Sequence, residues 1–336
     1  MEAESVLAPE SAREDLGVVI LGEGFGERVH RPGFERLRGE GVRVVAVAGR
    51  GDDWRKLALR EDVRIVSIAT PPFVHREQAL AAFAAGKAVL CEKPLGLDGT
   101  EANEMVSAAD RTGVPALIDF EFRAHRAFAR AQELLLASAV GDIERVNVEW
   151  RLPPRDTLNP SWKDSAELGG GTLLSLGVHV FDYIEWLVAP IVAVRGTLLA
   201  STEKDRSADH GCRATLTLEG DIEAALDIST VAGDRIGHRL AVTGSGGVLV
   251  LHNREPFGHL GAFELGIGRR PIHVEPPRRG EDARIGPFTE LARRLVLALR
   301  EGSPAEPGLT AGLRAQLVAD ALRRSDRLGT WTPVVV

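Results

Sequence analysis

Cysteine is scarce in this chain, with only Cys91 and Cys212 among 336 residues. One possible pair cannot staple a small scaffold, which excludes a disulfide framework as the basis of the fold. Both cysteines lie in apolar or alternating stretches, a pattern that favours buried, reduced thiols over a metal site. We therefore expect no metal and a cytoplasmic location.

Long apolar runs are also lacking. No segment approaches the ~20 apolar residues that a membrane-spanning helix needs, so we expect no membrane partner. The first residues are acidic and lack a basic stretch followed by an apolar one, which argues against a secretory signal. We expect residues 1–15 to form a mobile tail, and we see no repeat period in the sequence.

Basic residues are not in excess. Lys and Arg number 41 against 48 for Asp and Glu, and the resulting net charge of −7 argues against nucleic acid as a partner. The composition is otherwise globular, with 44% hydrophobic and 26% charged residues. A length of 336 residues predicts two domains.

Residues 16–124 alternate short β-branched runs with helical stretches, which is typical of βαβ units around a parallel sheet. We predict an α/β Rossmann domain here, a doubly wound parallel sheet covered by helices on both faces. The predicted strands are 17–21, 42–48, 63–68, 88–91 and 116–120. The predicted helices are 25–38, which Pro32 interrupts, 75–85 and 100–111.

Beyond a predicted helix at 127–138 the pattern changes to period-two alternation, which indicates strands with one covered face. We predict these strands at 144–151, 212–218, 222–228 and 239–242. Residues 125–336 are thus predicted to form an α+β domain on an open, largely antiparallel sheet. A helix over Leu309–Leu328 is expected to pack back on the interdomain region, before a short strand at 334–336.

A glycine-rich turn, Gly22-Glu23-Gly24-Phe25-Gly26, follows the first predicted strand and opens the first helix. Glycines at this place let the backbone approach a pyrophosphate, and the helix N-terminus offers free N–H groups. We therefore expect its glycines and Phe25 to bind a dinucleotide, against the alternative of a plain structural turn. Glu27 stands where the third glycine of G-x-G-x-x-G belongs, which predicts looser packing of the helix on the sheet.

The end of the second predicted strand bears on the choice of dinucleotide. An NAD-binding domain usually carries an acid there for the ribose 2′-hydroxyl, whereas this chain has Ala48-Gly49-Arg50. Arg50 suits a 2′-phosphate and favours NADP over NAD, although Asp52 and Asp53 follow closely. The alternative is that Arg50 is a solvated loop cation.

Three further motifs follow in order along the chain. They are Ala69-Thr70-Pro71-Pro72-Phe73-Val74-His75, then Gly86-Lys87 leading to Glu92-Lys93-Pro94-Leu95, then Gly169-Gly170-Gly171 leading to His179 and Asp182. With the glycine-rich turn they resemble the glucose-fructose oxidoreductase / inositol dehydrogenase / MocA (Gfo/Idh/MocA) family. The resemblance implies an NAD(P)-dependent dehydrogenase or reductase that transfers hydride between nicotinamide and a secondary alcohol or ketone of a sugar, polyol or sugar-derived substrate. It also implies a homo-dimer or homo-tetramer, with residues 125–336 as the substrate-binding and oligomerisation domain.

By this resemblance Lys93 and His179 are the catalytic residues. Lys93 is expected between nicotinamide and substrate, where an ammonium orients a reacting hydroxyl or stabilises an alkoxide. His179, on a predicted helix at 172–187, is expected to exchange the substrate's proton. Ligands on open α/β sheets bind at the carboxyl ends of the strands, so the other motif residues are expected at the cofactor. These are Thr70, Pro71, Pro72, His75, Glu92 and Pro94, the last in a fixed turn or a cis peptide bond.

The residues expected to contact substrate are Arg123, Trp162, Ser175 and Asp182. Ser175 departs from the family pattern, which has an aspartate four residues before the histidine, and serine cannot stabilise an imidazolium by charge. Helical spacing places Ser175, His179 and Asp182 on one face. Plainer alternatives are a domain-interface salt bridge for Arg123, a loop anchor for Trp162 and backbone capping for Asp182.

Two other functions stay open. The missing aspartate at Ser175 suits an NAD(P)-binding sensor or partner protein without turnover. A redox-assisted glycosidase that returns its hydride is the other alternative. Cofactor binding without any absorbance change across a substrate panel would indicate the sensor, and net hydrolysis without net cofactor consumption would indicate the glycosidase.

Overall fold

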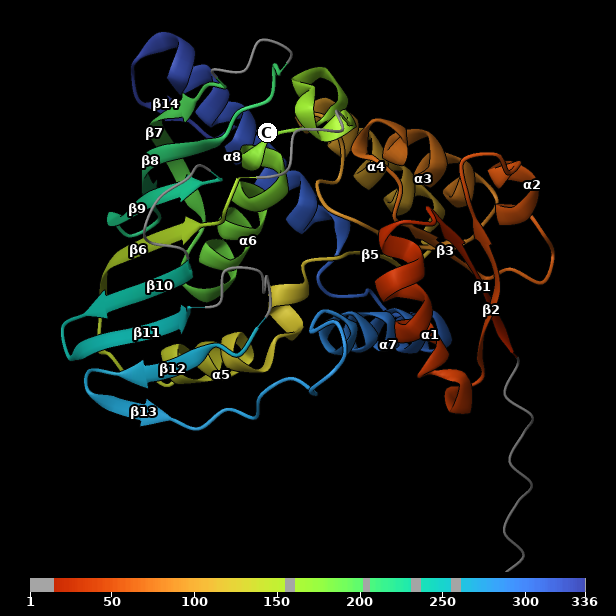
Figure 1. Ribbon diagram of the computed structural model, residues 1–336, viewed down its shortest axis with the longest axis horizontal. Coiled ribbons are helices and arrows are strands. Elements are labelled where there is room, and N and C mark those ends of the chain that lie inside the picture. The colour runs from red at the N-terminus through yellow and green to blue at the C-terminus, as the bar shows by residue number, and fades with distance from the viewer. Residues whose placement is uncertain (1–14, 155–160, 202–205, 231–236, 255–260, 336) are drawn as a thin grey trace, which may run out of the picture.

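The structure, a computed structural model, describes residues 15–154, 161–201, 206–230, 237–254 and 261–335. Apart from Asp15, the expected tail at 1–15 lies outside these residues. Figure 1 shows two halves, each built on one β-sheet. Cys91 and Cys212 are buried and unbonded, as the sequence predicts.

The first half is a five-stranded parallel sheet with strand order β2-β1-β3-β4-β5, which confirms the predicted Rossmann arrangement. Its strands are β1 Leu16–Leu21, β2 Val42–Ala48, β3 Ile65–Ile68, β4 Ala88–Cys91 and β5 Ala116–Ile118. Alternate side chains of β1 enter separate apolar clusters on the two faces, Val18 and Ile20 in one, Val19 and Leu21 in the other. Both faces are therefore covered.

Helices cover the sheet on each side (Figure 1). One face carries a π-helical turn at Gly26–His30, α1 Arg31–Glu35 and α7 Ile285–Glu301, and the other carries α3 His75–Ala84 and α4 Gly99–Thr112. A short helix, α2 Trp54–Ala58, follows β2. Pro32 lies in the first turn of α1, directly after the π-helical turn, so the predicted helix is interrupted there.

Helix α7 was not predicted, and it returns the chain to the first sheet after all but the last short strand of the second sheet have formed. Phe288, Leu291 and Leu295 pack in the same apolar cluster as Val18 and Ile20. The predicted division at 124/125 is therefore too simple, because residues after 125 supply one covering helix of the Rossmann half.

The second half is a nine-stranded sheet with order β13-β12-β11-β10-β6-β9-β8-β7-β14, antiparallel except for the pair β6 and β9. This confirms the predicted open, largely antiparallel sheet. The longer strands are β6 Ile143–Arg151, β7 Ile191–Leu199, β8 Gly211–Leu218, β9 Ile222–Ser229, β10 Gly237–Gly244 and β11 Gly247–Asn253. The shorter ones are β12 Glu264–Ile267, β13 Arg270–Ile272 and β14 Thr332–Pro333. The strand predicted at 334–336 lies two residues earlier, as β14, although the Val334 N–H still donates to the Val192 backbone oxygen of β7 at 2.9 Å. Residue 336 lies outside the described residues.

Helices α5 Arg126–Leu136 and α6 Val178–Leu187 pack on the inner side of this sheet (Figure 1). Helix α8 Leu309–Leu328 contacts α4 and β5 of the first half as well as α6 and β7 of the second. The close approach is visible at Gly312, where an added Cβ would lie 2.5 Å from the Ile118 side chain. The two halves thus share one continuous core.

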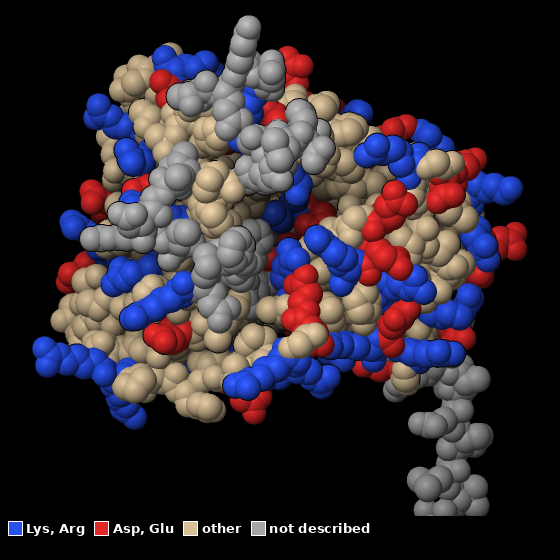
Figure 2. Space-filling view, in the orientation of Figure 1, with Lys and Arg blue, Asp and Glu red and all other residues tan. Residues whose placement is uncertain are grey.

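Charged side chains of both signs are interspersed on the face that Figure 2 shows, including the recess between the two halves. Among the described residues, no helix combines the length and apolar character that crossing a membrane requires.

Candidate active site

A cavity of about 1420 Å³ opens where the carboxyl ends of the parallel strands face the second half. A single small-molecule site usually takes ~300–1,000 Å³, so this cavity has room for a dinucleotide and a second molecule. The predicted site residues that line it are Gly22, Gly24, Phe25, Arg50, Thr70, Pro71, Pro72, Glu92, Lys93, Pro94, Trp162 and Ser175. Gly26, His75, Arg123, His179 and Asp182 are not among the described residues of its wall.

The glycine-rich turn after β1 has the shape of a phosphate cradle. Gly22 has φ of +112°, and a Cβ there would lie 2.4 Å from the backbone oxygen of Ala69, so the position requires glycine. A Cβ on Gly24 would meet nothing within 4 Å, because this backbone faces the open cavity. The turn leads into the N-terminal N–H groups at Gly26–His30, so the residues present fit a bound pyrophosphate.

Gly26 performs the packing role of the missing third glycine. A Cβ on it would lie 2.7 Å from Cγ2 of Ile20, so the helix already rests directly on the sheet. The prediction that Glu27 loosens the packing of the helix on the sheet is therefore wrong, because Gly26, one residue earlier, makes the close contact.

Two carboxylates stand at the end of β2, where the ribose of a dinucleotide is expected. The Asp52 carboxylate accepts a hydrogen bond from the Gly49 N–H at 2.7 Å. Glu23 reaches across from the glycine-rich turn, with its carboxylate 2.2 Å from the position of a Cβ on Gly49. Arg50 is exposed beside them, and all three line the cavity.

His75 ties two cofactor-side loops together from behind the wall. Its ring lies 2.8 Å from the carbonyl oxygen of Thr70 and 3.0 Å from that of Pro94. Burial lowers the pKa of His75, and a neutral ring donates to one of these carbonyls at a time. His75 thus holds the loops at Thr70 and Pro94 without reaching the cavity.

Lys93 projects from the carboxyl end of β4 into the cavity, and its peptide bond to Pro94 is cis. Its Nζ donates a hydrogen bond to the backbone oxygen of Ser175 at 2.8 Å. This bond spans the two halves of the molecule. Burial lowers the pKa of Lys93, and the nearby acids Glu92 and Glu121 oppose that shift.

A buried polar cluster supports Glu92 beside Lys93. The ring of His30 contacts Ser67 Oγ at 2.8 Å and Glu92 Oε1 at 3.1 Å, and it lies 3.8 Å from Asp119. Burial raises the pKa of Asp119. Burial is also the largest single influence on Glu92, but His30, Asp119 and Lys93 together outweigh it and lower the pKa of Glu92. Because both ring nitrogens of His30 are engaged, we interpret the cluster as a hydrogen-bonded support and assign it no metal.

Glu121 and Arg284 complete the wall around Lys93, and sequence reasoning missed both. Glu121 opens the turn that follows β5, at the same sheet edge as Glu92, so the rule that placed Glu92 at the site applied to it as well. Arg284 precedes α7 and lies over the Phe25 ring at 4.8 Å. Nothing in the sequence points to Arg284, because α7 returns from a distant part of the chain.

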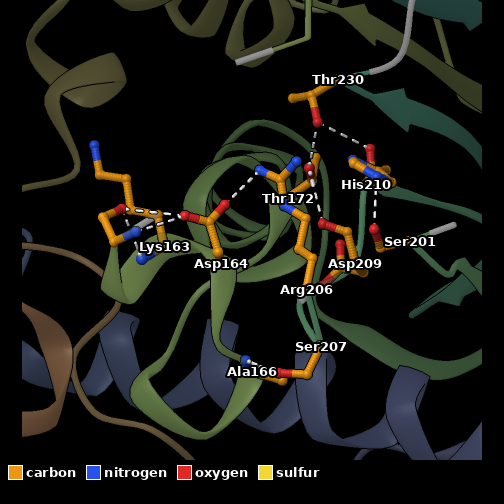
Figure 3. A network of polar contacts seen from close by, with 11 residues as sticks. Lys163, Asp164, Ala166, Thr172, Ser201, Arg206, Ser207, Asp209, His210 and Thr230 are labelled. Carbon is orange, nitrogen blue, oxygen red and sulfur yellow. Dashed lines mark hydrogen bonds and ion pairs between the residues drawn. The ribbon is translucent and has the colours of Figure 1, made fainter. Parts of the chain in front are cut away.

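The second half contributes a polar network to the opposite wall (Figure 3). Arg206 pairs with Asp164 at 2.8 Å, and both side chains are nearly buried. Asp209 accepts a hydrogen bond from the Leu173 N–H at 2.9 Å, and Thr172 contacts Thr230 at 3.0 Å. Burial raises the pKa of Asp209.

Trp162 and Lys163 lie at the edge of this network, with the Lys163 ammonium 5.7 Å from the centre of the indole ring. Both line the cavity, so the predicted position of Trp162 at the pocket agrees with its placement. An aromatic face, cations and a carboxylate are the groups that bind polyhydroxylated rings.

Of Ser175, His179 and Asp182, which helical spacing relates to one another, only Ser175 lines the cavity. The helix at 172–187 begins with a π-helical turn at Leu173–Gly177, whose i→i+5 bonding changes the phase of the residues that follow. Ser175 faces the cavity, whereas His179 is 1% exposed and packs against Phe120 and Phe122. His179 is not among the described residues of the cavity wall, and its proton exchange with the substrate stays a prediction.

Arg123 and Asp182 bind each other instead of lining the cavity. Arg123 Nη2 lies 2.6 Å from Asp182 Oδ1, and Nε donates to the same carboxylate at 3.1 Å. The pair joins the turn after β5 to α6, which matches the salt-bridge alternative and not the expected substrate contact. The carboxylate is saturated by the guanidinium, so we assign neither residue to substrate.

The parallel sheet, the phosphate cradle and the lysine at the junction define an NAD(P)-dependent oxidoreductase with a Rossmann domain. Residues 36–120 match the model described as oxidoreductase family, NAD-binding Rossmann fold, and residues 128–250 match the GFO/IDH/MocA C-terminal domain. The chain belongs to the Gfo/Idh/MocA family, as its motifs indicate.

Similar proteins agree with this assignment. The chain is 29% identical to the uncharacterized oxidoreductase sll0816 of Synechocystis sp., over 95% of this chain and 96% of that protein. It is 29% identical to dTDP-3,4-didehydro-2,6-dideoxy-alpha-D-glucose 3-reductase of Streptomyces violaceoruber, over 80% and 79%. The fold matches levoglucosan dehydrogenase in complex with NADH, with TM-score 0.82, 21% identity and coverage of 95% and 99%.

Proposed function

We propose that this oxidoreductase transfers hydride between nicotinamide and a secondary alcohol or ketone of a sugar, polyol or sugar-derived molecule. The observation that carries the proposal is the Lys93 ammonium, which lies in one cavity between a phosphate cradle and a polar wall. When bound, the dinucleotide supplies or accepts the hydride. Lys93 orients the reacting oxygen and stabilises its developing negative charge.

The carbohydrate character of the substrate rests on the opposite wall. Trp162 offers an apolar ring face, while Asp209 and Lys163 offer an acceptor and a donor for hydroxyl groups. Relatives of the chain include a levoglucosan dehydrogenase, a keto-sugar reductase and an inositol 2-dehydrogenase. Because Ser175 replaces the aspartate of the family pattern, an NAD(P)-binding sensor without turnover remains the alternative function.

The direct test is turnover on a substrate panel. Purified protein is mixed with NAD or NADP and free sugars, polyols or nucleotide-linked sugars, and nicotinamide absorbance is followed in both directions. Turnover with at least one of these substrates is expected. Cofactor binding with no turnover in any case contradicts the proposal and favours the sensor, while hydrolysis without net cofactor change favours the glycosidase.

We propose NAD as the preferred dinucleotide, in place of the NADP that Arg50 alone suggested. Glu23 and Asp52 bring two carboxylates to the end of β2, where a 2′-phosphate would be repelled and a 2′-hydroxyl accepted. The Kd of NAD is expected to be about tenfold lower than that of NADP, about 1.4 kcal/mol. Calorimetric titration with both dinucleotides measures the ratio.

The matched variant for this preference is Glu23→Gln, which removes one charge with little change of shape. The NADP affinity should rise while the NAD affinity changes little. Glu27→Gln serves as control, because Glu27 is exposed outside the cavity wall and pairs with Arg31. A wild-type preference for NADP, or equal shifts in both variants, would contradict the proposed role of Glu23.

Gly24→Ala tests the cradle. The new methyl group meets nothing within 4 Å of the protein, so the free energy of unfolding should not change. It occupies the space proposed for the pyrophosphate, and overpacking costs about 1–3 kcal/mol, so dinucleotide affinity should fall about tenfold to a hundredfold. Gly39→Ala, equally open but outside the cavity wall, is the control in the same titration. Unchanged affinity in Gly24→Ala would place the pyrophosphate elsewhere.

We further propose a homo-dimer or homo-tetramer in the cytoplasm. The side of the nine-stranded sheet opposite α5 and α6 is the surface available for such contacts, and sedimentation velocity measures the mass.

A further inference from the structure

Arg284 is a partly buried cation at the cavity wall to which the proposed function gives no task. Its side chain is 22% exposed, and it lines the same cavity as the glycine-rich turn after β1. Its Cζ atom lies 4.8 Å from the centre of the Phe25 ring, which belongs to that turn. Gly24, the neighbour of Phe25, has its backbone open to the cavity. A positive charge therefore stands beside the backbone proposed to receive the pyrophosphate.

A chain of aromatic contacts fixes the position of Arg284. The Phe25 ring meets the His30 ring edge-on, with centres 5.4 Å apart, and His30 stacks on Phe288 of α7 at 4.1 Å. Phe288 lies about one helical turn beyond Arg284, and it packs so closely on α1 that a Cβ on Gly33 would lie 2.3 Å from its ring. The start of α7 is thereby held on the glycine-rich turn. The guanidinium group needs little rearrangement to meet a ligand there.

The segment that carries Arg284 to the cavity, residues 273–284 between β13 and α7, is the light-blue coil that crosses from the second half to the first in Figure 1. We call it the strap. Glu275 pairs with Arg126 of α5, and Glu281 pairs with Arg36 at the end of α1. Of the strap residues, Arg284 is the one that lines the cavity. The strap is thus fastened to both halves and brings its last residue to the cavity wall.

The charges beside Arg284 favour an anion. Its Nε and Nη2 donate to the Asp282 carboxylate at 2.8 and 2.5 Å. Arg28, which lines the cavity from the turn at Gly26–His30, acts on the same carboxylate, because its charge adds to the hydrogen bonds of Arg284 in lowering the pKa of Asp282. Two guanidinium groups thus share one carboxylate, and a negatively charged ligand between them is attracted.

Two further acids, Glu121 and Glu92, also favour the charged form of Arg284. Glu92 is engaged with the His30 ring at 3.1 Å. Burial raises the pKa of Glu121 to about 8, so its carboxyl group is mostly uncharged below that pH. An anion beside Arg284 therefore meets more attraction from the guanidinium group than repulsion from these two acids.

We propose that Arg284 is a dinucleotide-binding residue that holds the pyrophosphate at the glycine-rich turn. This inference rests on the place of the dinucleotide in the proposed function. Asp282 engages Nε and Nη2, so the N–H groups of Nη1 are the donors left for a phosphate oxygen. A guanidinium group presents its donors in a rigid plane that matches phosphate oxygens, and such charge-assisted bonds are stronger than neutral ones.

The first test is calorimetric titration of wild type and Arg284→Gln with NAD and with ADP-ribose, which carries the same pyrophosphate without nicotinamide. The Kd of both ligands should rise about tenfold to hundredfold, the usual weight of a hydrogen bond to a charged group. Arg279→Gln is the control, because Arg279 is an exposed arginine of the strap outside the cavity wall. An unchanged Kd in Arg284→Gln, or a rise confined to NAD, overturns the proposal.

The second test separates ligand binding from a merely structural role of the pair between Arg284 and Asp282. Asp282→Asn keeps the size and shape of the side chain and removes the charge that competes with a phosphate for the guanidinium group. The Kd of ADP-ribose in this variant should stay at or below the wild-type value. If the pair merely holds the strap in place, Asp282→Asn should weaken binding as Arg284→Gln does. A Kd above the wild-type value therefore overturns the proposal.

These titrations also distinguish the role of Arg284 from the proposed hydride transfer. A wild type that binds ADP-ribose more tightly than Arg284→Gln does, but turns over no substrate, supports the role of Arg284 and contradicts the proposed function. A wild type that turns over, together with an unchanged Kd in Arg284→Gln, leaves the proposed function standing and removes Arg284 from the dinucleotide site.

Discussion

Replacing Lys93 by alanine is expected to lower kcat by about 10²–10³-fold, the usual cost of removing one preorganised group that stabilises a developing oxyanion. The ammonium is held in place by the Ser175 carbonyl at 2.8 Å, in a partly buried site where charge acts more strongly than in water. Its contribution is therefore expected to be largest in the transition state and small for the bound dinucleotide, whose phosphates we propose to lie at the glycine-rich turn.

The measurement is steady-state turnover alongside a separate titration of dinucleotide affinity. Kd for the dinucleotide should stay close to the wild-type value while kcat falls. Lys56→Ala is the control, because Lys56 is an exposed lysine of the same half that lies outside the cavity wall. Wild-type turnover in Lys93→Ala, or a loss confined to dinucleotide affinity, would remove Lys93 from the reaction.

The Rossmann half could be predicted because its signals are local. Five apolar runs, a glycine-rich turn and motifs at strand ends each depend on a few neighbouring residues, and all converge on one sheet edge. Helix α7 also had a local signal, since Ile285, Phe288, Leu291 and Leu295 recur at helical spacing. Its attachment to the first sheet had none, because it depends on contacts with residues far away in the sequence, such as Val18 and Ile20.

The substrate side was harder to predict because small backbone changes decide which side chains meet. Helical spacing relates Ser175 to His179, but only Ser175 lines the cavity, whereas His179 is buried against Phe120 and Phe122. Gly26 is another example, because it stands one residue before the position of the third glycine in G-x-G-x-x-G and still makes the contact between helix and sheet. Burial is equally invisible in a motif, and it is burial that changes Glu121 into a group titrating near neutral pH.

Replacing Arg123 by alanine is expected to lower the free energy of unfolding by about 3–5 kcal/mol, the range found when one partner of a buried ion pair is removed. The Asp182 side chain is 1% exposed and accepts hydrogen bonds from Nε and Nη2 of Arg123. Without the guanidinium this carboxyl group stays buried without its cation, at the contact between the turn after β5 and α6. Urea unfolding of wild type and variant measures the difference.

The loss should also depend on pH in a defined direction. Burial raises the pKa of Asp182 to about 7, and Arg123 offsets part of that rise, so the variant moves the folded-state pKa still higher. A folded-state pKa above the unfolded value gives stability that is present at low pH and lost as pH rises through it. The loss of unfolding free energy in Arg123→Ala should therefore be smaller at about pH 5 than at about pH 8.

Arg130→Ala is the control, because its exposed pair with Glu133 is worth at most about 1 kcal/mol. If the two variants lost equal stability, or if the Arg123→Ala loss did not change with pH, the buried pair would not be holding the halves together.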